Sequence, residues 1–341
     1  MNRVLVPGLV AAALCAMGVT AYLWIMQPAA ADGAPPARVV DIAEGTTFKQ
    51  VASLLARERL IRSQWGFLLL GRLTAADRRV PAGEYEIHAG MTPAEILSKL
   101  LNGQVVLHQV TIPEGYTAIQ VAELLGQKGL VDPQEFLRLV YDREFIRTLN
   151  LEVDGLEGYL FPDTYRFPRH ARPGEIVQAM VSATLQVLTP ELRARAEEIN
   201  MSLHQVLTLA SVVEKETGVD AERELVASVF HNRLRRHIPL QSDPTVIYGL
   251  PSFNGNLRKR DLASASPYNT YRFAGLPPGP IANPGAASIK AVLYPAPSRF
   301  LYFVSRNDGT HEFSASLADH NRAVAKYQPR RPNRTGSRPL S

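Results

Sequence analysis

Glu214 and Glu216 stand out because they are two acidic residues at the end of an otherwise apolar segment. The residues before them, Leu207–Val213, carry no charge. A carboxyl group in the last turn of a helix lies at the negative end of the helix dipole, and apolar neighbours such as Val213 exclude water from it. Both effects raise the pKa of a carboxyl group toward the range in which a general acid is protonated near neutral pH. The pattern therefore indicates acid–base catalysis by one of the two glutamates.

Only one of the two carboxyl groups can serve a single site, because residues two positions apart lie about 200° apart around a helix. Glu214 shares a face with Ser211, and Glu216 shares the opposite face with Val212. The residues alone do not choose between them. The alternative interpretation is a solvated helix end, in which Lys215 forms an ordinary salt bridge and no chemistry takes place.

A second group of candidates lies in loops that combine amides, hydroxyls and aromatic rings, between residues 241 and 271. Aromatic rings stack on the apolar faces of sugars, and amides bind hydroxyl or acetamido groups. The alternative is that these residues only build turns. The expected substrate-binding residues are Ser211, Gln241, Asp243, Tyr248, Asn269 and Tyr271.

Other chemistries have little support in the sequence. The eight histidines lack the spacing of a metal site, no Gly-x-Ser-x-Gly motif is present, and no Gly-rich phosphate loop appears. We therefore expect neither a metal nor a cofactor.

The net charge of +5 comes from 37 Lys and Arg against 32 Asp and Glu, and no basic face with interleaved aromatic residues is evident. Nucleic acid is not an expected partner. The only cysteine is Cys15, so the rest of the chain has no disulfide.

The segment that positions the two glutamates has the signals of a helix at both ends. Ser202 and Gln205 form a capping box at its start, and Gly218 follows its expected end near Thr217. A second helix is expected at about 221–236, followed by a long irregular region at 241–284. Loops of that length in a compact protein tend to be functional. Strands are expected at 301–304 and at 312–313.

An internal repeat precedes these helices. Residues 42–61 and 112–131 match at ten of twenty positions, beginning with Ile42-Ala-Glu-Gly45 and Ile112-Pro-Glu-Gly115. Each copy is expected to form a short strand, a Glu-Gly turn and a helix. Thr92 and Glu95 make a further capping box, and strands are expected at 83–87 and at 158–161.

The segment Val4–Met26 contains no charged residue over its 23 positions. At a rise of about 1.5 Å per residue, a helix of this length crosses a hydrocarbon core of about 30 Å. We expect a transmembrane helix with residues 1–3 in the cytoplasm and everything after Gln27 outside, an orientation that rests on Arg3 and the amino terminus. A cleaved signal peptide, with small residues at Ala29–Ala31, is the alternative.

The motifs of the second half, taken in order, resemble those of the YceG-like endolytic murein transglycosylases, the MltG family. The similar motifs are LASVVEKET at 209–217, VASVF with NRL at 226–234, LQSDPTVIYG at 240–249, PYNTY at 267–271, GLPPGPIANPG at 275–285, LYFV at 301–304, and His320 with Asn321. Together they span most of 156–327.

The strand and helix pattern of the repeat and this resemblance together predict an α+β fold in several parts. A transmembrane helix at 4–26 and a linker at 27–38 would precede a small LysM-like α/β module at 39–106. A larger catalytic domain would follow at 107–327, and residues 328–341 would form a basic, solvated tail. By the resemblance, Glu214 is the catalytic residue and the substrate is the glycan strand of nascent peptidoglycan, cut between MurNAc and GlcNAc. The protein would then lie in the plasma membrane with its catalytic domain on the outer side. Its partners would be the peptidoglycan synthases.

The expected mechanism uses one carboxyl group. Glu214 protonates the glycosidic oxygen and then takes a proton from the sugar's own 6-hydroxyl, which leaves a 1,6-anhydro end. Hydrolysis would require a second carboxylate, for which Asp243 and Asp261 are the candidates nearby in sequence. The rivals from other classes are a non-catalytic peptidoglycan-binding scaffold and an envelope peptidase.

Overall fold

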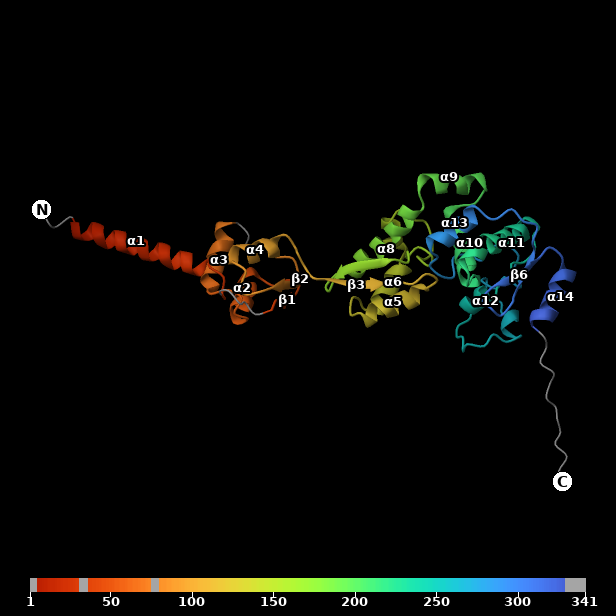
Figure 1. Cartoon of the computed structure of the whole chain (residues 1–341), viewed down its shortest axis with the longest axis horizontal. Coiled ribbons are helices and arrows are strands. Elements are labelled where there is room, and N and C mark those ends of the chain that lie inside the picture. Colours follow the sequence, from red (N-terminus) through yellow and green to blue (C-terminus); the bar gives the residue numbers. More distant parts are fainter. Residues whose placement is uncertain (1–4, 31–35, 75–79, 329–341) are drawn as a thin grey trace, which may run out of the picture. The chain divides into compact units, whose positions relative to one another are not determined.

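The computed structural model describes residues 5–30, 36–74 and 80–328, with a mixed α+β fold (Figure 1). The chain forms two compact units. Unit 1 comprises Met1–Gln109 with Arg166–Arg172, and unit 2 comprises Val110–Tyr165 with Pro173–Ser341.

Unit 1 is built on a pair of antiparallel strands. Val40 of one strand lies opposite Tyr85 of the other, and inward-facing residues alternate with exposed ones, as expected for a sheet with one covered face. The predicted strand at 83–87 is confirmed, as is the Thr92–Glu95 capping box. The elements of unit 1 are α1 (Leu5–Ile25), β1 (Arg38–Ile42), α2 (Phe48–Arg57), α3 (Gln64–Leu73), β2 (Gly83–Ile87) and α4 (Pro93–Leu101).

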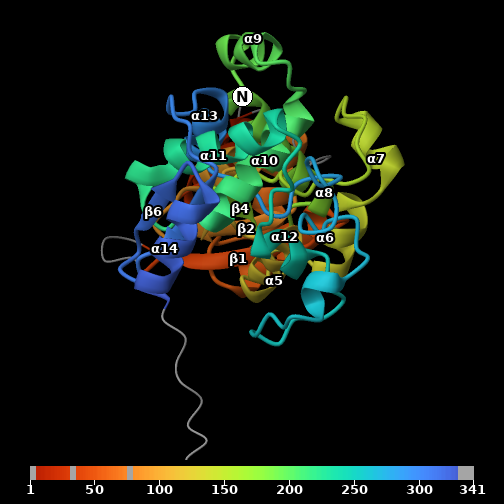
Figure 2. The ribbon, with the colours of Figure 1, turned by 90° about the vertical axis from the view of Figure 1, so that its right-hand side faces the viewer.

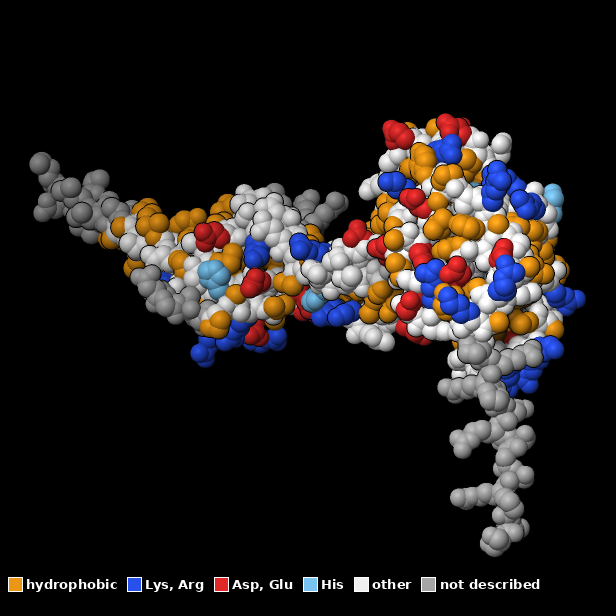
Figure 3. All heavy atoms as spheres, turned by 45° about the vertical axis from the view of Figure 1, so that its right-hand side comes forward, with side chains coloured by type: hydrophobic (Ala, Val, Ile, Leu, Met, Phe, Trp, Pro, Cys, Tyr) orange, Lys and Arg blue, Asp and Glu red, His pale blue; other side chains and the backbone are white. Residues whose placement is uncertain are grey.

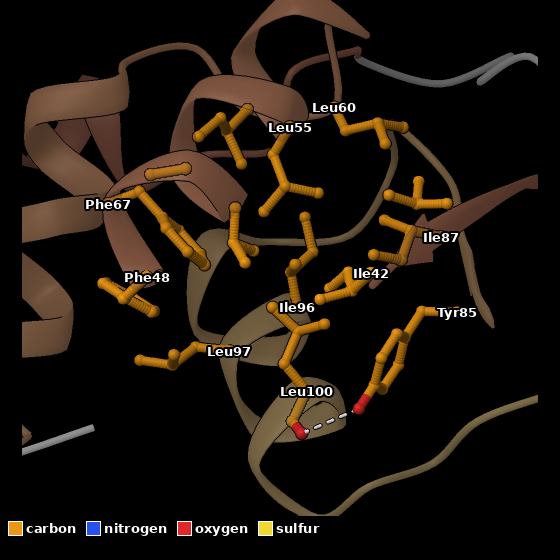
Figure 4. Close-up of a cluster of buried hydrophobic side chains, with 14 residues drawn as sticks. Ile42, Phe48, Leu55, Leu60, Phe67, Tyr85, Ile87, Ile96, Leu97 and Leu100 are labelled. Carbon is orange, nitrogen blue, oxygen red and sulfur yellow. Dashed lines mark hydrogen bonds between the residues drawn. The ribbon is translucent and has the colours of Figure 1, made fainter. Parts of the chain in front are cut away.

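The core of unit 1 lies between these strands and helices α2–α4. Figure 4 shows Leu55 of α2 and Ile96 of α4 pointing toward one another, with Ile42 of β1 beside them. Tyr85 is fully buried, and its hydroxyl donates to the carbonyl of Pro81 at 2.8 Å, so its polar end is satisfied.

Unit 2 begins with the second copy of the repeat. Strand β3 (Leu107–Thr111), whose first residues belong to unit 1, precedes helix α5 (Ala118–Gln127) as β1 precedes α2. Both helices start with the same Thr/Gln capping box, at Thr47 and at Thr117. The prediction of a strand, a turn and a helix in each copy is confirmed.

Helix α10 (Leu203–Glu216) lies at the centre of unit 2. The expected capping box is present, and Val206–Val213 are all buried. Helix α10 packs against α11 (Arg223–Arg235) and α13 (Ala286–Leu293), and Figures 1 and 2 both place the three together. The strands expected near 301 and 312 are confirmed as the antiparallel pair β5 (Tyr302–Ser305) and β6 (His311–Ser314).

The remaining elements of unit 2 lie before and after this helical group. They are α6 (Pro133–Val140), α7 (Arg143–Thr148), β4 (Thr164–Pro168), α8 (Pro173–Val187), α9 (Pro190–Glu198), the 3₁₀ turn η1 (Asp220–Glu222), α12 (Asp243–Tyr248), the 3₁₀ turn η2 (Asp261–Ala263) and α14 (Leu317–Tyr327). Strand β4 pairs with β3.

Two sequence-based expectations differ from the structure. The strand expected at 158–161 is wrong: Gly158 has φ +83°, and the Leu160 N–H donates to the Asn283 side chain instead of a neighbouring strand. The strand of that region is β4, which begins at Thr164. The second helix begins later than expected, because residues 220–222 form the 3₁₀ turn η1.

The N-terminal segment is helical from Leu5 to Ile25. Among the residues that the structure describes, none of the helices combines the length and the apolar character of a membrane span. The expected span starts at Val4, which lies outside the described residues, as do the side chains of 5–9, 11 and 12. Residues 31–35 of the expected linker and 329–341 of the expected tail also lie outside them.

Leu55→Ala tests the core of unit 1. We expect the free energy of unfolding of this unit to fall by about 2–5 kcal/mol, because the substitution leaves a cavity among fully buried side chains. Hydrogen exchange of unit 1 peptides, followed by mass spectrometry, measures the change. Leu73→Ala is the matched control: Leu73 is 70% exposed, so the same change there should cost less than about 0.5 kcal/mol. Equal effects of the two substitutions would contradict the assignment of this core.

Candidate active site

Glu214 is held in place at the end of α10 by two donors. The Gly285 N–H and the Ser288 hydroxyl both donate to Oε2 of Glu214, at 3.1 and 2.7 Å. Ser288 lies in the first turn of α13, which packs on α10. The Glu214 side chain is 8% exposed. Its carboxyl group is therefore fixed in orientation, and Oε1 is the oxygen that neither donor occupies.

A buried guanidinium group lies beside that second oxygen. Arg223, the first residue of α11, is 3.8 Å from Oε1 of Glu214 and 2.9 Å from Asp220. Arg223 is 8% exposed, and its Nε has no hydrogen-bond partner among the described residues. An unpaired buried donor costs stability, and such costs are typical of functional sites. The cation also attracts negative charge to this corner of unit 2.

Sequence reasoning missed a third member of the site, Glu114. This residue belongs to the Glu-Gly turn of the second repeat copy, and its carboxyl group lies directly against Gly285. A Cβ atom built on Gly285 would meet Glu114 Oε1 at 1.9 Å, and one built on Gly115 would meet Glu214 Cγ at 3.5 Å. Partial burial and the charge of Glu214 raise the pKa of Glu114, against the opposing effect of Arg223. The recurrence of Glu-Gly in both copies was visible, but its distance from Glu214 in the sequence concealed the contact.

Asn283 fastens the Glu-Gly turn to the helical group. Its backbone N–H donates to the Tyr116 carbonyl and its carbonyl accepts from the Gly115 N–H, both at 2.9 Å. The side chain, fully buried, donates to the Tyr116 carbonyl and accepts from the Leu160 N–H. Lys215 adds a bond from its Nζ to the Gly115 carbonyl at 3.2 Å. The turn is thus attached at several points, which keeps Glu114 beside Glu214.

Glu216 points into a different environment, as its position on the helix predicts. The Ser242 hydroxyl donates to its Oε1 at 2.5 Å, and burial raises the pKa of Glu216. No described contact links it to Gly285 or Ser288. Glu216 is therefore packed against the α12 loop, whereas Glu214 lies among the donors of α13 and the loop before it.

Unit 2 also contains a cavity of about 650 Å³. Tyr248 and Tyr268 line it with ring centroids 4.9 Å apart, and the loop Pro278–Pro280 forms one wall. Arg143 and Arg147 contribute cationic groups, whereas Glu157 contributes a carboxyl group. This combination of aromatic faces and hydrogen-bonding groups suits a polar ligand with apolar faces, such as a sugar.

Glu157 is the most deeply placed acid of this cavity. It is 5% exposed and accepts bonds from the Ala118 N–H, the Tyr248 hydroxyl and the Asn283 amide, at 3.0, 3.2 and 3.3 Å. Burial raises its pKa to about 7, although the bonds from Ala118 and Tyr248 oppose the shift. The Asn283 side chain also binds the Tyr116 carbonyl of the Glu-Gly turn, which lies beside Glu214. The same side chain therefore contacts both the acid of the cavity and the turn next to Glu214.

The expected substrate-binding residues are distributed over several places, and only Tyr248 lines the cavity. Ser211 is buried and accepts from the Ile281 N–H, and Asn269 is buried with bonds to the carbonyls of Leu262 and Ser264, so both support loops. The other three lie at the α12 loop: the Tyr271 hydroxyl donates to Asp243, and the Gln241 side chain accepts from Arg233.

No cluster of His, Cys, Asp and Glu suited to a metal ion occurs among the described residues. On the face of unit 2 that Figure 3 shows, cationic and anionic side chains lie interspersed among apolar ones.

Comparison with known proteins gives one family. The model of the YceG-like family matches residues 40–326. An endolytic murein transglycosylase of Bacillus subtilis is 33% identical over 304 residues, covering 84% of this chain and 84% of that protein. One of Streptococcus pneumoniae is 30% identical over 320 residues, covering 84% of this chain and 58% of that protein. A crystal structure of a YceG-like protein from Listeria monocytogenes matches with a TM-score of 0.60 at 33% identity, covering 84% of this chain and 98% of that one.

Glu157→Gln tests the buried carboxyl group. The pKa of Glu157 is higher in the folded chain than in the unfolded chain, so its stabilising contribution is fully present below about pH 4.5 and is lost as the pH rises to about 7. Relative to Glu157→Gln, the wild-type chain should therefore lose about 3 kcal/mol of unfolding free energy across that range. Urea unfolding of both proteins at pH 4, 5.5 and 7.5 measures the difference. The unfolding free energy of the wild type minus that of Glu157→Gln should fall as the pH rises. A value that stays constant or increases with pH would contradict the assignment.

Proposed function

The chain belongs to the YceG-like family, and we infer from its candidate active site that it is an endolytic murein transglycosylase. The observation that carries this inference is the position of Glu214. Its carboxyl group is fixed through Oε2 by Gly285 and Ser288, beside the cationic Arg223. A fixed carboxyl group with one free oxygen is what protonation of a glycosidic oxygen requires.

We propose that Glu214 acts first as an acid and then as a base. The protonated carboxyl group gives its proton to the oxygen between MurNAc and GlcNAc as the bond from that oxygen to the MurNAc C1 breaks. The carboxylate then takes the proton of the 6-hydroxyl of the same MurNAc, and the 6-oxygen bonds to C1. The product is a 1,6-anhydro end, and no water is consumed. Arg223 would stabilise the carboxylate that exists between the two steps.

The cavity of unit 2 is the proposed place for sugar units next to the one that is cut. Tyr248 and Tyr268 offer ring faces, and Pro278–Pro280 belong to the same loop as Gly285. A glycan strand is long and repetitive, so a subsite of this kind holds the strand while the catalytic carboxyl group acts in its interior. That arrangement suits endolytic cleavage.

Unit 1 and α1 support two further proposals. Unit 1 has two helices between two antiparallel strands, and we propose that it is a LysM-like module that contacts glycan. Helix α1 carries no acidic or basic residue, and its side chains Leu14, Met17 and Leu23 are exposed. Exposed apolar side chains on a helix without charges favour lipid contact, so we propose that α1 anchors the enzyme in the plasma membrane, with the rest of unit 1 and all of unit 2 outside the cytoplasm. Nascent strands, and the synthases that make them, would then lie within reach.

Glu214→Gln should lower the rate of cleavage of purified sacculi by about 10²–10⁴-fold, since the amide cannot supply a proton. Products are quantified by liquid chromatography and mass spectrometry. Glu216→Gln is the matched control, two positions along the same helix; it should retain cleavage, because Glu216 bonds Ser242 away from the site. Loss of activity only in Glu216→Gln would reverse the assignment. Binding of sacculi by the wild-type protein without any product would favour the scaffold.

The ends of the wild-type products test the reaction type. We expect 1,6-anhydroMurNAc ends, each lighter by one water than a reducing end, because the sugar's own 6-hydroxyl attacks C1. High-resolution mass spectrometry of the released fragments distinguishes the two. Reducing ends would mean that water is the nucleophile and that the enzyme is a hydrolase.

A further inference from the structure

The two Glu-Gly turns of the repeat have different surroundings. Gly45 and Gly115 both adopt positive φ, at +79° and +73°, so the same turn forms in each copy. Nothing lies within 4 Å of a Cβ atom built on Gly45. A Cβ atom on Gly115 would contact Glu214 and Lys215, at 3.5 and 3.6 Å. The second copy of the turn has therefore become part of the catalytic centre, whereas the first has remained open.

Gly285 brings the acid of this turn next to the catalytic acid. Its N–H binds Glu214, and the space that its missing side chain leaves is filled by the carboxyl group of Glu114. Two carboxyl groups thus share the surface of one residue. Glu114 is itself an exposed residue, so it can be reached by a bound strand.

The charged groups that face Glu114 act in both directions. Glu214 and Asp220 disfavour a negative charge on it and raise its pKa, whereas Arg223 lowers its pKa. Lys215, whose Nζ binds the Gly115 carbonyl, is the other charged group at this turn. Two carboxyl groups thus meet at Gly285 beside one buried cation, and neighbouring carboxyl groups of this kind can share one proton.

We propose that Glu114 is a positioning residue of the reaction centre: with Glu214 it holds the proton that the glycosidic oxygen receives. This inference rests on the proposed function. The proton is passed to the glycosidic oxygen through Glu214, whose Oε2 and the carboxyl group of Glu114 meet at Gly285. The proton of the 6-hydroxyl returns to the pair when the anhydro bond forms, so the proton count is unchanged over one turnover.

Glu114→Gln tests the proposal through the pH profile of kcat/KM on sacculi. Without the neighbouring charge, the remaining carboxyl group loses its proton at lower pH, and the alkaline limb should move down by about 1 pH unit. Glu114→Asp keeps the charge and should leave the limb close to its wild-type position. A merely structural role for Glu114 predicts a lower rate with the limb unmoved, which would overturn the proposal.

Gly285→Ala tests the same contact without changing either acid. The new methyl group collides with the far end of a flexible side chain, so the carboxyl group of Glu114 moves away while the backbone, at φ −75°, accommodates alanine. The limb should shift in the same direction as in Glu114→Gln. An unshifted limb in this variant counts against the proposal.

Glu44→Gln is the matched control, because Glu44 occupies the equivalent turn of the first repeat copy and is exposed. It should leave the pH profile unchanged. If the wild-type enzyme yields no cleaved product, the proposed function itself fails. If it cleaves, and neither Glu114→Gln nor Gly285→Ala moves the limb, only the role of Glu114 is refuted.

Discussion

The backbone pairing between Asn283 and the turn at Gly115 and Tyr116 is the interaction on which the active site depends. These two hydrogen bonds join the loop before α13 to the repeat-derived part of unit 2. The bonds of the fully buried Asn283 side chain to Tyr116, Leu160 and Glu157 fix the same junction from a second direction. A buried backbone N–H or carbonyl group without a hydrogen-bond partner lowers the stability of the fold. Each of these bonds therefore stabilises the junction and also satisfies a group that would otherwise be buried without a partner. The Glu-Gly turn is therefore held beside Glu214 by a network of neutral amides.

Three glutamates of unit 2 show how different surroundings give one side chain different roles. Glu157 is enclosed and bonds to neutral donors, so its charge is disfavoured and its pKa rises to about 7. Glu216 is buried against Ser242 and supports the α12 loop. Glu214 accepts two hydrogen bonds through Oε2 and has Arg223 beside Oε1, and its proposed role in proton transfer rests on this arrangement. Burial alone would have singled out Glu157 or Glu216 and not Glu214, the proposed catalytic acid.

Local signals predicted much of the fold. The capping boxes expected at Thr92 and Ser202 formed, because a cap involves residues only three positions apart. The opposite orientations of Glu214 and Glu216 followed from the period of the helix.

The strand expected at 158–161 did not form, because the Leu160 N–H donates to the side chain of the distant Asn283. The neighbourhood of Glu114 and Gly285 escaped detection for the same reason: it is set by tertiary packing, and sequence periodicity carries no information about it. Ser211 and Asn269 were expected at the substrate, but their polar groups satisfy buried backbone atoms, a demand that is invisible before the loops are placed.

The contact between Asn283 and Tyr116 joins residues 167 positions apart in the chain. A ribosome releases the segment containing Glu114 long before it has made α13, so a growing polypeptide has the first half of the centre without the second. Gly285 and Ser288 must emerge and pack before Glu214 has its two donors. A centre assembled in this way stays incomplete until the segment that forms α13 has been synthesised and has packed on α10.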